Sequence, residues 1–340
     1  MNTIKRIRVR LAAGIEKWSL KAPFQITGYT FTEIETLIVS LHDEDIVGYG
    51  EALGVYYRND TPVSMLAQIE ALRGQIEAGI SRQQLLHLLP AGGARNALDC
   101  ALWDLEAKRI GKPVWKLVGL DAPRPLLTTF TLGADTPSAM VDAAREFTGI
   151  RALKLKLTND ELNAQRVRSV RSAYPDAWIM VDANQGFTRE SFARLLPALV
   201  ETRVAVIEQP FPVGSEAWLD GLDSPIPIAA DESVQDHNQL ANLVGLVEMI
   251  NIKLDKCGGL TEALAMAEQA RKLGFELMVG NMCGSSLSMA PAFVLGQSCE
   301  VVDLDGPISM TGDRSPGVAY HDGMISCADE VWGAPAAAIA

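Results

Sequence analysis

Six ionisable residues recur at a nearly regular interval from residue 156 onward in this 340-residue sequence. They are Lys156, Asp182, Glu208, Asp231, Lys253 and Asp303, separated by 26, 26, 23, 22 and 50 residues, so the last interval spans two repeats. Each residue lies at or next to the C-terminal end of a short apolar run. If every run is a parallel strand of one closed sheet, these side chains converge on the face where barrel enzymes have their active sites.

Three of these residues are acids that end consecutive runs. Asp182, Glu208 and Asp231 would lie within a few ångströms of one another, which is unfavourable for like charges unless a cation neutralises them. Oxygen ligands with no His or Cys nearby are typical of Mg²⁺, with Mn²⁺ as a substitute, rather than of Zn²⁺. Any one acid could instead cap the following helix or pair with a surface lysine. The three together predict a metal site.

Two of the lysines are expected to face each other across this cluster. Lys154 and Lys156 are two residues apart on one strand, so both point inward in a barrel. Lys253 ends the sixth run, four positions around an eight-stranded ring from Lys156. Two opposed amines can remove a proton from one face of a carbon and return one to the other, provided that their pKa values are lowered toward neutrality. The metal would bind the substrate carboxylate and stabilise an enediolate. Each lysine alone could instead be a counter-ion to the acids.

The elements that must position these residues follow a βαβ pattern. Short β-rich runs alternate with polar turns and amphipathic helical stretches, which favours parallel strands. The eight runs are Leu126 to Thr131, Ala152 to Leu157, Trp178 to Asp182, Val204 to Glu208, Ile226 to Asp231, Met249 to Lys253, Glu276 to Gly280 and Glu300 to Asp303. We therefore expect an α/β fold with a (β/α)₈ TIM-like barrel. An open doubly wound sheet is the alternative, but the glycine-rich phosphate loop that often follows its first strand is missing.

The first third of the chain has a different, mixed character. Alternating segments at Ile4 to Leu11, Glu35 to Leu41 and Ile46 to Glu51 predict an antiparallel sheet, and Thr61 to Ile80 and Gly93 to Arg109 have helical spacing. We expect an N-terminal α+β capping domain at 1–122 that supplies substrate-lid and specificity loops. The barrel would occupy 123–315, and a C-terminal segment, 316–340, would return toward the cap.

Composition limits the classes of partner. The formal net charge of −12 argues against a nucleic-acid surface, which needs clustered Lys and Arg. The five cysteines form no CxxC pair, which favours reduced thiols in the cytoplasm. We find neither the apolar core of a signal peptide nor a run long enough to span a membrane. The expected partner is a small molecule, and a homo-oligomer is left open.

The motifs as a set resemble those of the muconate lactonizing enzyme subgroup of the enolase superfamily. They are Lys154 to Lys156, Val181 to Asn184, Ile207 to Pro210, Ala230 to Ser233, Asn251 to Lys253 followed by Gly258 and Gly259, and, in the cap, Arg95 to Asp104. The resemblance implies a modified, enolase-type barrel with Lys156 and Lys253 as the two bases. It further implies Mg²⁺ bound by Asp182, Glu208 and Asp231, with Asn184 and Lys256 supporting these acids. Lys256 is expected to lie near Lys253, one pleat face away.

Within the subgroup, Asp303 and Asp305 resemble the Asp-x-Asp motif of the L-Ala-D/L-Glu epimerases and related dipeptide epimerases. The resemblance implies an isomerase that moves a proton at the α-carbon of the C-terminal residue of an L,X-dipeptide. On one side of a strand the two acids can bind an α-ammonium by charge-assisted hydrogen bonds, although one could instead brace the loop. By the same resemblance Thr131, Lys154, Asn281 and Cys283 line the substrate site.

The chain departs from the glutamate-specific members in the loop after its first strand. Those members carry an arginine there that grips the substrate side chain, whereas Gln25 to Phe31 contains none. Aromatic residues Tyr29, Phe31, Tyr56 and Tyr57, with Val55, predict a mostly neutral lid and a non-acidic C-terminal residue. Arg58 could still reach the site and restore glutamate binding. Loops carry specificity in this fold and are the hardest part to place from sequence.

Other activities remain open on the same scaffold. Cycloisomerisation, o-succinylbenzoate synthesis and N-acylamino acid racemisation would use the same metal and lysines, but would give Asp303 and Asp305 no ammonium to bind. An acid-sugar dehydratase typically needs a histidine base, and no histidine ends a predicted strand: the four are His42, His87, His237 and His321. The alternative from another class is a non-catalytic, metal-binding barrel scaffold.

Overall fold

The N-terminal part of the computed structural model, which describes residues 8–222 and 224–334, is an antiparallel sheet with helices packed on one face. The sheet has the order β1 (Arg10–Ile26), β2 (Tyr29–Asp43) and β3 (Ile46–Ala52). The 3₁₀ turn η1 (Tyr56–Arg58) and helices α1 (Pro62–Ala71), α2 (Arg73–Glu77), α3 (Arg82–Leu88), α4 (Gly93–Ile110) and α5 (Val114–Leu117) follow. Residues 4–7 of the strand expected at Ile4 to Leu11 lie outside the described chain, and the first described strand runs from Arg10 to Ile26.

The core of this cap follows from the pattern in β2. Leu37, Val39 and Leu41 alternate along the strand and are fully buried, since every second side chain points to the same face. They pack with the apolar face of α4. The helix expected from Thr61 to Ile80 is interrupted at Leu72, which separates α1 from α2.

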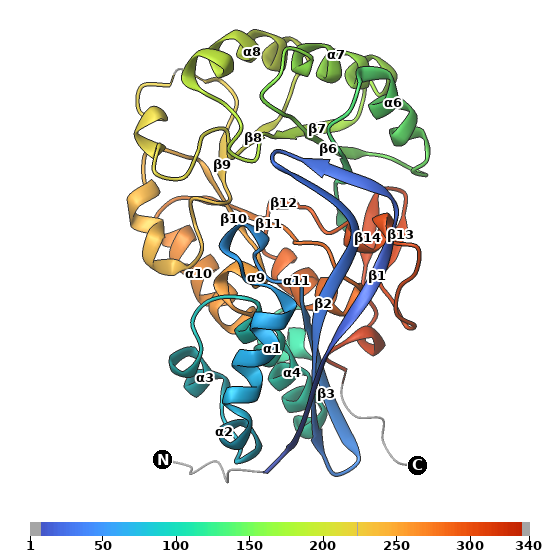
Figure 1. Cartoon of the computed structure of the whole chain (residues 1–340), viewed down its shortest axis with the longest axis vertical. Helices are drawn as coiled ribbons and strands as arrows, with labels where there is room; N and C mark the ends of the chain where they lie inside the picture. The colour runs from blue at the N-terminus through green and yellow to red at the C-terminus, as the bar shows by residue number, and fades with distance from the viewer. Residues whose placement is uncertain (1–7, 223, 335–340) are drawn as a thin grey trace.

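The second part is a curled parallel sheet of eight strands surrounded by helices (Figure 1). Its strands, each paired with the next, are β5 (Phe130–Leu132), β6 (Ala152–Lys156), β7 (Trp178–Asp182), β8 (Val206–Glu208), β9 (Ile228–Ala230), β10 (Met249–Ile252), β11 (Glu276–Val279) and β12 (Val301–Val302). The Thr129 amide donates to the Val302 carbonyl at 3.1 Å, and the Leu304 amide to Thr128 Oγ1 at 3.0 Å. These bonds join the two edges, so the predicted barrel fold is confirmed.

Helices cover the outside of this barrel. They are α6 (Pro137–Arg145), α7 (Asn163–Ala173), α8 (Arg189–Glu201), α9 (Leu254–Cys257), α10 (Leu260–Lys272) and α11 (Ser286–Gly296). Between β8 and β9 the described residues form the 3₁₀ turn η2 (Glu216–Trp218), and between β9 and β10 they form η3 (His237–Leu243). The sequence pattern predicted a helical stretch after every strand, but at these two places the described residues form 3₁₀ turns instead of α-helices.

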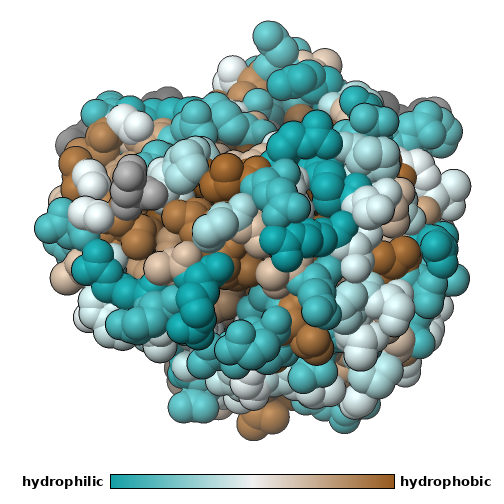
Figure 2. Space-filling model, turned by 90° about the horizontal axis from the view of Figure 1, so that it is seen from above, coloured by the Kyte–Doolittle hydropathy of each residue, from teal (hydrophilic) through white to brown (hydrophobic). Residues whose placement is uncertain are grey.

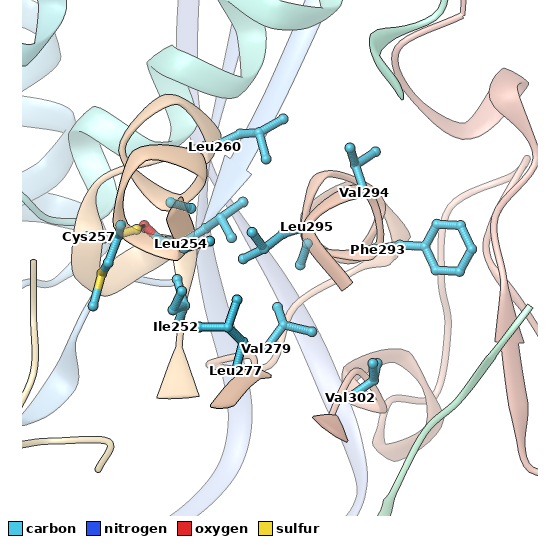
Figure 3. Close-up of a cluster of buried hydrophobic side chains, with 14 of the residues drawn as sticks. Ile252, Leu254, Cys257, Leu260, Leu277, Val279, Phe293, Val294, Leu295 and Val302 are labelled. Atoms are coloured by element: carbon cyan, nitrogen blue, oxygen red, sulfur yellow. Dashed lines mark hydrogen bonds between the residues drawn. The ribbon is translucent and has the colours of Figure 1, made fainter. Parts of the chain in front are cut away.

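Strand alternation sorts the side chains between two environments. On β6, Leu153 and Leu155 point outward into an apolar cluster, whereas Lys154 and Lys156 point into the barrel. Figure 3 shows the same outer layer on the other side of the barrel, where Ile252, Val279 and Leu295 meet between the strands and α11. Inside the barrel, a separate apolar cluster that includes Met180, Met249 and Met278 fills the space below the polar residues.

The long β1–β2 hairpin connects the cap to the barrel (Figure 1). At its tip, Thr27 Oγ1 lies 3.1 Å from the Leu157 carbonyl and 3.0 Å from the Ala183 carbonyl. These carbonyls directly follow Lys156 and Asp182 in the chain, so the hairpin tip is held beside the C-terminal ends of β6 and β7.

The C-terminal segment lies between the barrel and the cap. Strand β13 (Ala319–His321) pairs with β14 (Met324–Ser326), and β14 pairs with the short strand β4 (Leu126–Leu127). The single strand expected at Leu126 to Thr131 is thus divided into β4 and β5. The 3₁₀ turn η5 (Asp329–Val331) follows. Trp332 Nε1 then donates to the Tyr49 carbonyl of β3 at 3.0 Å, and the Gly333 amide donates to Asp104 of α4 at 2.9 Å. The described residues thus end against the cap, and the predicted part of this segment at 335–340 lies outside them.

Hydrophilic residues cover most of the surface seen from above, with smaller hydrophobic areas between them (Figure 2). None of the helices within 8–222 and 224–334 is both long enough and apolar enough to cross a membrane.

Candidate active site

The ends of the barrel strands bring the predicted polar residues into one buried cluster. Lys156 pairs in register with Asp182, and Asp182 with Glu208, across β6, β7 and β8. Asp231 and Lys253 directly follow β9 and β10. All five side chains are buried, with 7% or less of each residue exposed.

Lys154 lies among the carboxylates. Its Nζ is 2.8 Å from Glu208, 2.8 Å from Asp303 and 3.2 Å from Asp182. Burial by itself would lower the pKa of Lys154, but the Asp303, Glu208 and Asp182 charges raise it well above its ordinary value. The ammonium is therefore a fixed positive charge within the cluster.

The two other lysines contact acids on opposite sides of Glu208. Lys156 Nζ donates to Asp182 at 2.6 Å and to Asn184 Oδ1 at 3.1 Å. Lys253 Nζ donates to Asp231 at 2.6 Å. Burial opposes the charge of Lys253, but Asp231 together with Glu208 raises its pKa well above the ordinary value, so the expected lowering toward neutrality does not arise from these protein groups.

The three acids of the predicted metal site differ in charge state. Burial would raise the pKa of Asp182 and Asp231, but Lys156 and Lys154 hold the first, and Lys253 and Lys256 the second, below the ordinary value. Burial and the Asp182 charge raise the pKa of Glu208 to about 7. Within 8–222 and 224–334, no three Asp, Glu, His or Cys side chains have the spacing of a formed metal site; lysine ammonium groups lie between the acids.

One acid in this cluster was not among the predicted site residues. Glu232, next to Asp231, is 4% exposed; its Oε1 accepts a bond from Asn184 Nδ2 at 3.2 Å, and its Oε2 is buried without a hydrogen-bond partner. Burial and the Asp231 and Asp182 charges raise its pKa to about 8. Its position outside the predicted strand, beside a more obvious candidate, hid it in the sequence.

Two neutral residues hold the predicted acids in place. Asn251 Nδ2 donates to Glu208 Oε1 at 2.8 Å, and Thr129 Oγ1 donates to Asp303 at 2.6 Å. Asn251 could have been found from the sequence, because it lies two residues before Lys253 on the same strand and so shares its inward face.

Lys256 belongs to a helical turn rather than to a strand. It lies in α9, so the expectation of a neighbour one pleat face away from Lys253 was wrong. Its Nζ lies 2.5 Å from the Asp231 carboxylate and 3.0 Å from the Asn251 carbonyl. Burial lowers its pKa despite the Asp231 charge.

The motif glycines place this turn against the cap. A Cβ on Gly258, where φ is +82°, would lie 2.2 Å from Arg95 Nε, and one on Gly259 would lie 2.5 Å from Asp99 Cβ. Arg95 in α4 also donates to the Cys257 carbonyl at 2.5 Å. The cap helix motif and the glycine pair thus form one contact surface.

The residues predicted to bind substrate lie beside Lys154. Asp303 and Asp305 follow β12 in an irregular segment that leads into the 3₁₀ turn η4 (Gly306–Ser309), so the expected strand geometry was wrong. Asp305 Oδ2 accepts a bond from the Thr131 amide at 2.6 Å. Asn281 Nδ2 donates to the Asp303 carbonyl at 2.6 Å, and Asn281 Oδ1 accepts from the Cys283 amide at 2.7 Å.

Two cavities meet at the opposed lysines. The smaller, about 90 Å³, is lined by Thr131, Lys154, Asp303 and Asp305 among others; the larger, about 360 Å³, extends under the cap. Lys156, Lys253, Asn281 and Cys283 line both. Both lysines therefore face a common space that could hold a bound molecule.

The cap covers the larger cavity with the expected aromatic residues. Tyr56 packs against Tyr29, Phe31 and Tyr57, with ring centroids 4.6 to 5.3 Å apart. Arg58 is exposed and donates to Gln235 Oε1 at 3.3 Å, and it lines neither cavity.

Two family models match most of the chain. The mandelate racemase / muconate lactonizing enzyme N-terminal domain matches residues 8–119, and the enolase C-terminal domain-like family matches residues 139–327.

Individual relatives extend this likeness over nearly the whole length. An L-Ala-D/L-Glu epimerase of Escherichia coli is 40% identical over 91% of this chain and 97% of its own, and an N-acetyl-D-glutamate racemase of a Pseudoalteromonas species is 39% identical over 85% and 92%. The crystal structure of a dipeptide epimerase from Methylococcus capsulatus, complexed with Mg and L-Arg-D-Lys, is 31% identical and superposes with a TM-score of 0.88 over 94% of this chain and 97% of its own. The chain belongs to the mandelate racemase / muconate lactonizing enzyme family of the enolase superfamily.

Proposed function

We propose that this protein is a dipeptide epimerase that inverts the α-carbon of the C-terminal residue of an L,X-dipeptide by 1,1-proton transfer. The observation that carries the proposal is the pair Lys156 and Lys253, two buried amines from opposite parts of the barrel that line the same space. One amine takes the α-proton, and the other gives a proton to the opposite face. In each direction, the amine that takes the proton must start neutral, and the amine that gives a proton must start charged.

Asp182, Glu208 and Asp231 would hold the Mg²⁺ that this chemistry needs, with Mn²⁺ as a substitute. The donors fit, because all are buried carboxylates at or next to the ends of neighbouring strands, and Glu208 Oε2 has no polar partner among the described residues besides the Lys154 ammonium at 2.8 Å. When bound, the ion supplies positive charge to the substrate carboxylate as negative charge develops there. The Asn184 amide donates to Asp182 Oδ1 at 2.8 Å and Lys256 Nζ lies 2.5 Å from Asp231, so these two residues orient two of the acids.

The smaller cavity would hold the N-terminal residue of the dipeptide. Asp303 and Asp305 provide negative charge for its ammonium group, since charge-assisted hydrogen bonds are the stronger ones. Thr131, Lys154, Asn281 and Cys283 complete the wall. The cavity of about 90 Å³ favours a small N-terminal side chain such as that of alanine.

N-acylamino acid racemisation is the second candidate function. Both oxygens of Asp303 already have partners in this chain, Thr129 and Lys154, which leaves the ammonium role mostly to Asp305. A substrate with an acylated nitrogen would not need that charge.

Proton exchange in deuterium oxide tests the proposal. Purified protein with MgCl₂ is incubated with L-Ala-L-Xaa dipeptides and the matching N-acetyl-L-amino acids, and loss of the α-proton signal is followed by NMR. Exchange with free dipeptides at rates at least about tenfold above the N-acetyl compounds supports the epimerase. The reverse order would favour the racemase, and no exchange with any compound would remove both.

We further infer a cytoplasmic location, because all five cysteines are free thiols in the structure. We also propose domain boundaries at residues 122 and 315 and a homo-oligomeric state.

A further inference from the structure

The larger cavity has an apolar wall where the cap covers the opposed lysines. This wall contains Leu20, Phe24, Ile26, Phe31, Ile34 and Met282. Five of these residues come from the β1–β2 hairpin, whose tip Thr27 is fixed to the ends of β6 and β7. The wall therefore has a defined position relative to Lys156, one of the two proposed bases.

The charges around this cavity do not suit a second carboxylate. Among the described residues, the basic side chains that line it are Lys156 and Lys253, and each already contacts an acid. The charged side chains that the cap contributes are acidic: Glu33, Glu35 and Asp60. An ionised substrate side chain in the apolar part would lose hydration without gaining a cation, which is strongly unfavourable.

The same acids do not form a site for a basic side chain. Glu33 and Glu35 lie at the exposed edge, where Lys17 Nζ is 3.6 Å from the first and 2.5 Å from the second. Asp60 accepts a hydrogen bond from the Gly93 amide at 2.7 Å. Since each acid has a partner within the chain, the apolar wall remains the main feature that a substrate side chain would meet.

We infer that the dipeptide's C-terminal residue carries a large apolar or aromatic side chain, and that acidic side chains are excluded. This specificity rests on the proposed epimerase function, and it differs from the glutamate substrates for which relatives are named. Burial of the apolar side chain against the hairpin provides binding energy. An acidic side chain is excluded because no basic side chain among the described residues of this wall is available to pair with it.

The test compares kcat/KM for α-proton exchange with L-Ala-L-Phe, L-Ala-L-Leu, L-Ala-L-Glu and L-Ala-L-Lys. We expect the Phe or Leu dipeptide to exceed the Glu dipeptide by about 100-fold and the Lys dipeptide by about tenfold or more. The highest kcat/KM with Glu or Lys would overturn the specificity and leave the epimerase standing. No exchange with any dipeptide would overturn both.

A matched pair of variants tests directly whether a basic side chain in the cavity wall would admit an acidic substrate. Phe31→Arg places a guanidinium in the cavity wall, whereas Thr32→Arg adds the same charge on the same strand at an exposed residue that does not line the cavity. Phe31→Arg should raise the ratio of kcat/KM for Glu over Phe dipeptides at least about tenfold, and Thr32→Arg should leave it within about twofold. An equal change in both variants, or none in a folded Phe31→Arg, contradicts the inference. The wild-type panel decides the matter if Phe31→Arg does not fold.

Discussion

Asp255 links the cap to the barrel through a buried carboxyl whose ionisation is unfavourable. It lies in α9, is 5% exposed and accepts a hydrogen bond from the Gly54 amide at 2.8 Å. Burial raises its pKa from 3.8 to about 7, an effect that the Gly54 amide only partly offsets. We predict that Asp255→Asn, which keeps an acceptor oxygen but cannot ionise, removes a pH-dependent loss of stability.

The sign and the magnitude follow from proton linkage. Between pH 4 and pH 7 the unfolded chain has released this proton and the folded protein retains it, so the free energy of unfolding falls as the pH rises. Above about pH 7 the folded protein carries the buried charge, and the loss is complete. A rise from 3.8 to about 7 corresponds to at most about 4 kcal/mol, or about 5 °C in Tm for a cooperative chain of this length.

Thermal unfolding followed by circular dichroism at pH 5 and pH 8 measures this effect. Asp255→Asn should raise Tm relative to wild type at pH 8 by several degrees more than at pH 5. Asp176→Asn, at an exposed position, is the control and should change Tm little at either pH. An Asp255→Asn variant that is destabilised equally at both pH values would refute the reasoning, since the carboxylate would then be serving as an ionised acceptor.

Three further predictions concern the site and its support. Removal of divalent ions with EDTA should abolish α-proton exchange, and added MgCl₂ should restore it and raise Tm, because an ion that binds only the folded protein stabilises it; exchange that persists in EDTA would contradict the metal assignment. Asp305→Asn keeps the acceptor for the Thr131 amide but loses the charge, so dipeptide kcat/KM should fall about tenfold at pH 8. Because burial and Asp303 raise the pKa of Asp305 to about 6, this difference should shrink below pH 6; a pH-independent difference would argue against the role. Gly258→Ala should lower the free energy of unfolding by about 2 kcal/mol more than Gly119→Ala, since both residues have φ near +80° but only Gly258 lies against Arg95; equal losses in a denaturant titration would mean that this contact can relax.

Much of the fold could be predicted from the sequence, because strand patterning and spacing are local signals. The run Trp178 to Asp182 coincides with β7, and the inward direction of Lys154 and Lys156 follows from alternation alone. The full length of β1 was not predicted, since few of its side chains are buried. Its position depends on tertiary contacts such as those of Thr27 with the ends of β6 and β7.

The convergence of the candidate residues on one cluster was predictable, but their contacts were not. Regular spacing identified Asp182 and Lys253, whereas the central place of Lys154 among three acids depends on side-chain packing across the barrel. Glu232 required knowledge of burial, which a loop residue does not reveal in sequence. The apolar wall combines Met282 with residues of the β1–β2 hairpin that lie 248 to 262 positions earlier in the chain, so no local pattern could indicate it.

The central claim is that Lys156 and Lys253 act on opposite faces of one α-carbon. Its most direct test is α-proton exchange in deuterium oxide with the L,L and L,D epimers of the same dipeptide, using Lys156→Met and Lys253→Met. In each variant the rate of epimerisation should fall by at least about 10³-fold. One variant should still exchange the α-proton of the L,L epimer, and the other should still exchange that of the L,D epimer. Exchange of the same epimer in both variants would place the two amines on one face and contradict the account.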